Sequence, residues 1–70
     1  MLDVASIIKL CRKKSGMDIY DLAKKSGVAY STIVNIEKGY GRPNLNTLEY
    51  ILEAMGFELE ILPKEERYER

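Results

Sequence analysis

Residues 18–39 constrain the fold of this chain more than any other segment, because they hold two short helical patterns separated by a glycine. Asp18 is a favourable N-cap for the first helix, since a carboxylate accepts a hydrogen bond from an unpaired amide of the first turn. Gly27 is the expected stop, because a left-handed backbone costs least at glycine. A second helix is predicted over residues 30–38. Two helices joined by so short a corner must cross steeply.

The second of these helices has an apolar side and a polar side. At helical spacing Ile33 and Ile36 turn toward the core, and Ala23 of the first helix is small enough to lie where the two helices touch. The opposite side of the second helix carries four uncharged side chains that can hydrogen-bond: Tyr30, Ser31, Thr32 and Asn35. The pattern therefore predicts a polar face that is free to meet a partner.

Two further helices are predicted on either side of this unit. Asp3 and Gly16 mark the ends of one over residues 4–14 or 4–15, and Asn44 and Gly56 mark the ends of another over residues 45–55. Their expected inward stripes are Val4, Ile7, Ile8 and Cys11 in the first, and Leu45, Leu48, Ile51, Leu52 and Met55 in the last. The chain is therefore expected to be mainly α, with a compact four-helix domain over residues 1–56.

This arrangement resembles the lambda-repressor-like helix-turn-helix regulators, also called the Cro/C1-type or XRE family. The similarity runs from Ile8 to Met55, about two-thirds of the chain. It rests on a set of positions in register: Arg12, Met17, Asp18, Leu22, Ala23, Gly27, Val28, Ser31, Thr32, Ile33, Ile36, Glu37, Gly39, Arg42, Pro43, Leu48 and Gly56. The resemblance implies a domain that binds double-stranded DNA through the helix over residues 30–38.

The resemblance also implies roles for particular residues. The base-reading side chains would be Tyr30, Ser31, Thr32 and Asn35, and the phosphate contacts would be Lys24, Lys25, Lys38, Tyr40 and Arg42, with amides at the starts of the second and third helices. Arg12 and Glu37 would form a shielded ion pair. The chain departs from the family at Ile19, where Gln is common, and at Ala29, where a capping Ser or Thr is common.

Residues 57–62 alternate apolar and acidic side chains, which is the period of a β-strand. Family members often continue with a fifth helix here. A lone strand leaves its backbone groups unpaired, so we expect Phe57, Leu59 and Ile61 to form one side of a dimer strand that pairs across a homodimer. The alternative is an extended segment that lies on its own domain. Residues 63–70 are expected to be a charged tail.

Composition excludes several classes of protein. The 70 residues contain no histidine and one cysteine, and Cys11 is expected to be a small core residue in a reducing cytoplasm. No apolar run approaches the roughly 20 residues needed to span a membrane. We expect no catalytic site, no metal, no cofactor and no enzyme activity.

The net charge is zero, but it is unevenly divided. Residues 1–42 carry eight Lys or Arg and four Asp or Glu, giving +4, whereas residues 43–70 carry three and seven, giving −4. The basic part contains the predicted recognition helix, so the chain can present one end to phosphates. The alternative is a chance asymmetry between solvated surfaces.

Three functions remain open at this point. The first is a sequence-specific regulator that acts as a homodimer, of the phage, plasmid or mobile-element repressor type. The second is an antitoxin that binds both its operator and a toxin. The third is a protein-interaction module, such as an antirepressor, that does not bind DNA.

Overall fold

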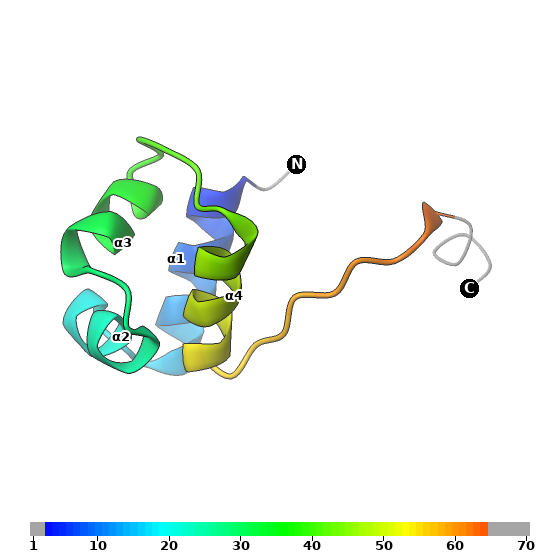
Figure 1. The fold of residues 1–70 in the computed structure, drawn as a ribbon. Helices are drawn as coiled ribbons and strands as arrows, with labels where there is room; N and C mark the ends of the chain where they lie inside the picture. The colour runs from blue at the N-terminus through cyan, green and yellow to red at the C-terminus, as the bar shows by residue number, and fades with distance from the viewer. Residues whose placement is uncertain (1–2, 65–70) are drawn as a thin grey trace.

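The helix boundaries follow from local capping residues. In the computed structural model, which describes residues 3–64, the helices are α1 (Val4–Ser15), α2 (Ile19–Ser26), α3 (Tyr30–Glu37) and α4 (Leu45–Ala54) (Figure 1). The mainly α, four-helix architecture expected from the sequence is confirmed. α3 ends at Glu37 rather than Lys38, and α4 ends at Ala54 rather than Met55, because the last residue of each predicted helix serves as its C-cap.

Three of the four helices begin with the same hydrogen bond. The side chains of Asp3, Asp18 and Asn44 accept from the backbone amide three residues later, at 2.8, 2.7 and 2.8 Å. The bond from the Ser6 amide lowers the pKa of Asp3 below its ordinary 3.8, so the stabilisation it provides is present above that pH and is lost as the pH falls through the lowered pKa. Ala29, at the start of α3, makes no such bond.

Each helix contributes one fully buried residue to a single core. Ile8, Leu22, Ile33 and Ile51 have no exposed surface, and they come from α1, α2, α3 and α4 in turn. Met17, Ala23 and Val28 pack against this cluster while remaining half-buried. The steep crossing of α2 and α3 is therefore held by residues from all four helices.

Two expected core positions are wrong. Leu45 is 62% exposed and Ile7 is 36% exposed, although both lie on predicted inward stripes. Ala54 was not predicted and is buried. Helical spacing identifies the side of a helix that faces inward, but how far along the helix that side is covered depends on where the neighbouring helices lie.

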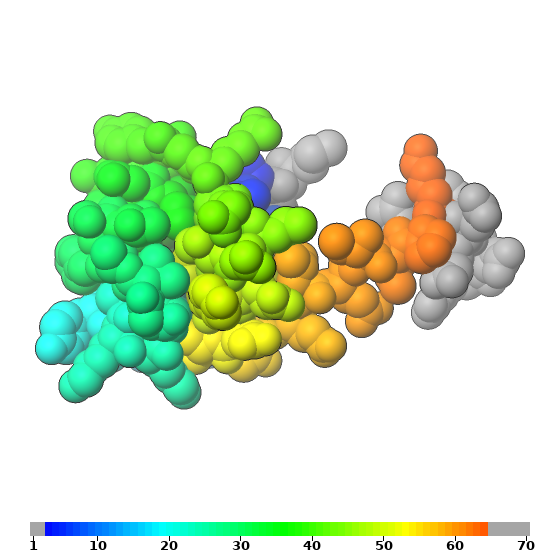
Figure 2. All heavy atoms as spheres, viewed as in Figure 1, coloured from blue at the N-terminus to red at the C-terminus, as the bar shows by residue number. Residues whose placement is uncertain are grey.

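Beyond Gly56 the chain leaves the helical bundle. The amide of Phe57 donates to the carbonyl of Leu52 at 2.8 Å, and Leu59 packs against the core. Residues 60–64 are exposed and project away from the helices (Figures 1 and 2). Residues 3–64 contain no strand, so the pairing predicted for residues 57–62 requires a second chain and stays a prediction. The predicted charged tail lies outside the described residues from residue 65 onward.

No helix within residues 3–64 has the length and apolar character needed to cross a membrane.

Replacing Gly27 by alanine tests the corner between α2 and α3. Gly27 has φ +77°, and a Cβ there would meet nothing within 4 Å, so the substitution introduces backbone strain without a clash. We expect Gly27→Ala to lower the free energy of unfolding by about 1 kcal/mol in urea titrations. Gly41→Ala is the matched control, because Gly41 also has open space around it and no positive φ. An equal loss in both variants would contradict the assignment.

Candidate nucleic-acid interface

The outward side of α3 is formed by the four predicted polar residues. Tyr30, Ser31, Thr32 and Asn35 are all exposed, and Tyr30 retains 53% of its surface. The opposite side of the helix is buried through Ile33 and Ile36. Because the two sides belong to one short helix, the packing of the isoleucines determines where the polar side chains point.

The corner that leads into α3 is locally stabilised. Gly27 donates its amide to the carbonyl of Ala23 at 3.0 Å, which closes α2. Ser26 then accepts the amide of Val28 with its Oγ at 3.1 Å, and the half-buried Val28 packs against the core. These contacts stop α2 and begin α3 within a few residues, as the sequence predicted for a helix-turn-helix.

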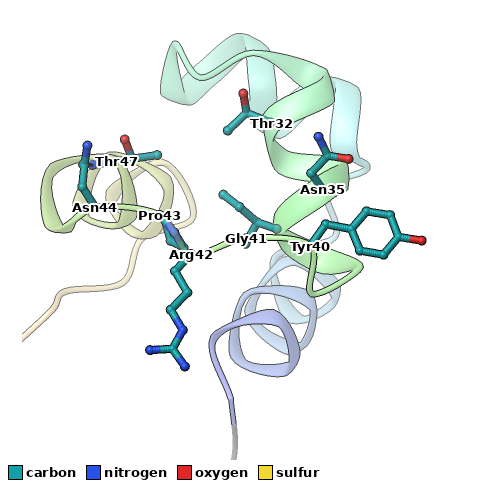
Figure 3. A pocket seen from close by; sticks show the side chains of 9 residues that line it. Thr32, Asn35, Tyr40, Gly41, Arg42, Pro43, Asn44 and Thr47 are labelled. Atoms are coloured by element: carbon teal, nitrogen blue, oxygen red, sulfur yellow. Dashed lines mark hydrogen bonds between the residues drawn. The ribbon is translucent and has the colours of Figure 1, made fainter.

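A shallow hollow lies beside the polar side of α3 (Figure 3). Its walls come from α3, the following loop and the first turn of α4, and consist of Thr32, Asn35, Ile36, Tyr40, Gly41, Arg42, Pro43, Asn44 and Thr47. Two predicted base-reading residues, Thr32 and Asn35, therefore line the same hollow as two predicted phosphate contacts, Tyr40 and Arg42. This hollow is hereafter called the α3–α4 hollow.

Two residues of the α3–α4 hollow were missed at the level of sequence. Asn44 was assigned only as the cap of α4, and Thr47 was assigned no role. Asn44 Oδ1 accepts the Thr47 amide at 2.8 Å, which holds both residues at the start of α4. The sequence held one indication that these residues lie near α3. The loop that joins α3 to α4 is short and contains Gly39 and Gly41, and residues from both helices line the hollow.

The predicted phosphate-binding side chains lie at both ends of α3. Lys24 and Lys25 are exposed in the last turn of α2, just before the corner. Lys38 follows α3, and its Nζ lies 5.9 Å from the centre of the Tyr40 ring, which is within the range of a cation–π contact. Cations before and after the helix create a positive field along its exposed side.

The Arg42 side chain points in a different direction from that of Tyr40, the other predicted phosphate contact in the hollow. Figure 3 shows its side chain extending away from Thr32 and Asn35, while Tyr40 lies near Asn35. Arg42 also lines a second hollow with Asp3, Val4, Ala5, Ile7, Gly39 and Gly41, near the start of α1. The structure thus places Arg42 at the edge of the polar surface rather than at its centre.

The amides at the starts of α2 and α3 are not equivalent. Asp18 accepts the amide of Asp21, and the Asp21 carboxylate accepts the amide of Asp18 at 3.5 Å, so two carboxylates occupy the start of α2. A phosphate would be repelled there. The start of α3 has no side-chain cap, because Ala29 cannot accept a hydrogen bond with its side chain. Its first-turn amides fit an anion better than those of α2.

Arg12 and Glu37 join α1 to the end of α3. Arg12 Nε donates to Glu37 Oε2 at 2.7 Å, Nη2 donates to Oε1 at 3.0 Å, and Nη1 donates to the carbonyl of Met17 at 3.0 Å. The two side chains are only 15% and 5% exposed. The hydrogen bonds that Arg12 donates to the Glu37 carboxylate raise the pKa of Arg12 above its ordinary value. This forked pair fixes the distance and rotation of α3 relative to α1.

Comparison with protein families places this geometry in a known class. A family model described as Helix-turn-helix, HTH_3, matches residues 8–62. Comparison with curated proteins and with solved structures returned no match.

The fold and the exposed polar side of α3 define a helix-turn-helix, DNA-binding transcription regulator. The chain belongs to the HTH_3 family, the Cro/C1-type or XRE group of these regulators, as its sequence resemblance implied. Most of the matched range lies within the four helices.

Removing one partner of the Arg12–Glu37 pair should lower the free energy of unfolding more than replacing both partners. Arg12→Ala leaves a nearly buried carboxylate unpaired, so we expect a loss of about 3 kcal/mol in the free energy of unfolding. Arg12→Met combined with Glu37→Leu should recover most of that loss, because no charge then remains to be desolvated. Arg42→Ala, which removes an exposed arginine, is the control. Thermal and urea unfolding measure all three; a double variant as unstable as Arg12→Ala would contradict this account.

Proposed function

We propose that this chain is a sequence-specific repressor that acts as a homodimer on a two-fold symmetric operator. The observation that supports this most strongly is the uncharged polar side of α3, which is exposed beside the α3–α4 hollow and bordered by lysines. An α-helix fits the major groove of DNA, where base edges present distinct patterns of donors and acceptors. DNA lies in the cytoplasm of a bacterial cell, which is where such a regulator would act.

The four α3 side chains suit base edges in different ways. The Asn35 amide can donate to N7 and accept from N6 of an adenine, which is a two-bond contact. The Thr32 methyl can touch the methyl group of thymine, and Ser31 can bond either a base or a phosphate. Tyr30, at the start of the helix, can reach a phosphate or a sugar. Each good base contact contributes about 1–3 kcal/mol of discrimination.

Phosphate contacts would set the register of α3 in the groove. Lys24 and Lys25 would hold one side of the groove, and Lys38 and Tyr40 the other. Arg42 would contact the backbone at the margin, since its side chain diverges from Asn35 (Figure 3). The uncapped amides at the start of α3 would add contacts that carry no charge of their own.

The short length of α3 supports the proposal that the chain acts as a homodimer. An eight-residue helix contacts only a few base pairs, so a single domain specifies too short a sequence to be found reliably in a genome. Two copies related by a two-fold axis would read two half-sites about one helical turn apart, or a multiple of that distance. The exposed segment after Gly56 offers the surface for this pairing. A compact repressor of this kind suits a phage, plasmid or other mobile element.

A second candidate is an antitoxin that binds both operator and toxin. The observation that favours it is the same exposed apolar segment, because Ile61 is 78% exposed and free to meet another protein. Expressing the neighbouring gene with and without this chain distinguishes the two functions. Growth arrest by the neighbour that this chain relieves would support the antitoxin, and unaffected growth would exclude it.

Substituting Asn35 tests whether the polar side of α3 contacts bases. After selection of bound sequences from random DNA, we expect Asn35→Ala to weaken binding to the selected site by about tenfold or more and to relax preference at one base pair. Asn46→Ala is the matched control, because Asn46 is exposed on α4 but does not line the α3–α4 hollow. Gel-shift titration measures both. Equal affinity of the two variants, or no selected sequence at all, would exclude sequence-specific reading by α3.

Substituting Lys38 tests the phosphate contacts. We expect Lys38→Ala to lower the affinity for the selected site and for random DNA by similar factors, because a phosphate contact carries no sequence information. The slope of log affinity against log salt concentration should become shallower by about 0.9. A loss confined to the selected site, with an unchanged slope, would assign Lys38 to base reading instead.

A further inference from the structure

The polar side of α3 carries no ionised group. Glu37 is the one charged residue of the helix, but it is 8% exposed and paired with Arg12. The exposed residues of α3 are all uncharged: Tyr30, Ser31, Thr32 and Asn35. A base edge that approaches this side therefore meets hydrogen-bonding groups and the Thr32 methyl group, but neither a cation nor a carboxylate from α3.

The cations around the polar side of α3 stand at its margins. The lysines of the interface lie in the last turn of α2 and at the C-cap of α3. Arg42, the cation that lines the α3–α4 hollow, extends away from Thr32 and Asn35 (Figure 3). Positive charge is thus placed where the phosphates of a duplex would run, and not beside the two side chains that line the hollow from α3.

This distribution of charge distinguishes between base pairs. Guanine presents two acceptors in the major groove, and its commonest specific contact is a cation, Arg or Lys, while cytosine presents a donor that suits a carboxylate. Adenine presents one acceptor and one donor, which complement the single donor and acceptor groups of the Asn35 amide. A surface without either kind of ion therefore suits A·T pairs better than G·C pairs.

We propose that the base pairs facing Thr32 and Asn35 are two neighbouring A·T pairs, and that one of them is recognised through the C5-methyl group of its thymine. The inference rests on the sequence-specific DNA binding proposed above and names the base pairs that the same surface accepts. It goes beyond the individual contacts, because it excludes G·C from both positions and assigns part of the affinity to a methyl group.

The spacing of Thr32 and Asn35 makes the two pairs neighbours. The two residues project from successive turns of α3 and line the same hollow (Figure 3). Side chains three residues apart on a helix have Cβ atoms about 5–6 Å from each other. Stacked base pairs are about 3.4 Å apart, so two such side chains reach consecutive pairs.

The surroundings of Thr32 suit an apolar group. Ile36 and Pro43 line the α3–α4 hollow together with Thr32, so that apolar surface lies beside the polar side of α3. A thymine methyl group placed against the Thr32 methyl group would leave water, which is favourable. A G·C pair presents no methyl group in the major groove and would gain nothing there.

Uracil substitution tests the methyl contact. Replacing each thymine of the selected site by uracil in turn removes one C5-methyl group and leaves base pairing intact. At one thymine of each half-site we expect about fourfold weaker binding in gel shifts, the effect of losing one buried methyl group.

Two substitutions at the exposed Thr32 assign that effect to its methyl group. Thr32→Ser removes the methyl group and keeps the hydroxyl, so this variant should bind the thymine and uracil sites equally. Thr32→Val keeps a methyl group and loses the hydroxyl, so it should retain the difference. A site in which no thymine matters, or a uracil effect that Thr32→Ser leaves unchanged, overturns the methyl contact.

A second base analogue tests the adenine contact and its position. Substituting 7-deazaadenine, which has a C–H group in place of N7, should weaken binding about tenfold at an adenine in the pair next to the uracil-sensitive thymine. Asn35→Ala should abolish this sensitivity, and the control Asn46→Ala, which lies outside the hollow, should retain it. Sensitive pairs that are not neighbours overturn the proposed arrangement.

Failure of this inference differs from failure of the proposed function. A defined selected site with G·C pairs where Thr32→Ser and Asn35→Ala change the base preference overturns the A·T assignment and leaves sequence-specific binding standing. A selection that returns no defined site overturns both.

Discussion

The burial of Ile33 and Ile36 is the constraint on which the interface depends. α3 has only eight residues, and a helix of that length is not stable alone in water. Burying each isoleucine contributes about 1.5–3 kcal/mol, which is enough to hold the helix on the core. Since both residues are 4% exposed or less, α3 has little freedom to rotate. The polar side chains opposite them are exposed as a direct consequence.

The Arg12–Glu37 pair complements this apolar packing with directional contacts. Apolar burial resists separation of the helices but permits small sliding and rotation, whereas three hydrogen bonds from one guanidinium define a single geometry. A shielded pair of this kind adds little net stability, because desolvation offsets the attraction. Its contribution is positional, and a recognition helix needs positional accuracy to place side chains against base edges.

Electrostatics within the domain direct an anion toward α3 rather than α2. The overall charge is zero, and the start of α2 is occupied by the carboxylates of Asp18 and Asp21. The start of α3 is uncapped, and lysines lie on both sides of the helix. The absence of a cap at Ala29 therefore has a consequence beyond lost helix stability: it leaves amides available at the surface where a phosphate would approach.

The local sequence was sufficient to predict the four helices and their boundaries to within a residue. This is because Asp3, Asp18, Asn44 and the glycines act on the backbone within one turn. It also indicated which side of α3 is polar, because helical periodicity is a local property. Tertiary structure decided what depends on the placement of distant segments: the exposure of Leu45, the hollow that α3 and the first turn of α4 line together, and the divergence of Arg42 from Asn35. Those outcomes depend on where neighbouring helices lie and on the path of a loop, which no single segment encodes.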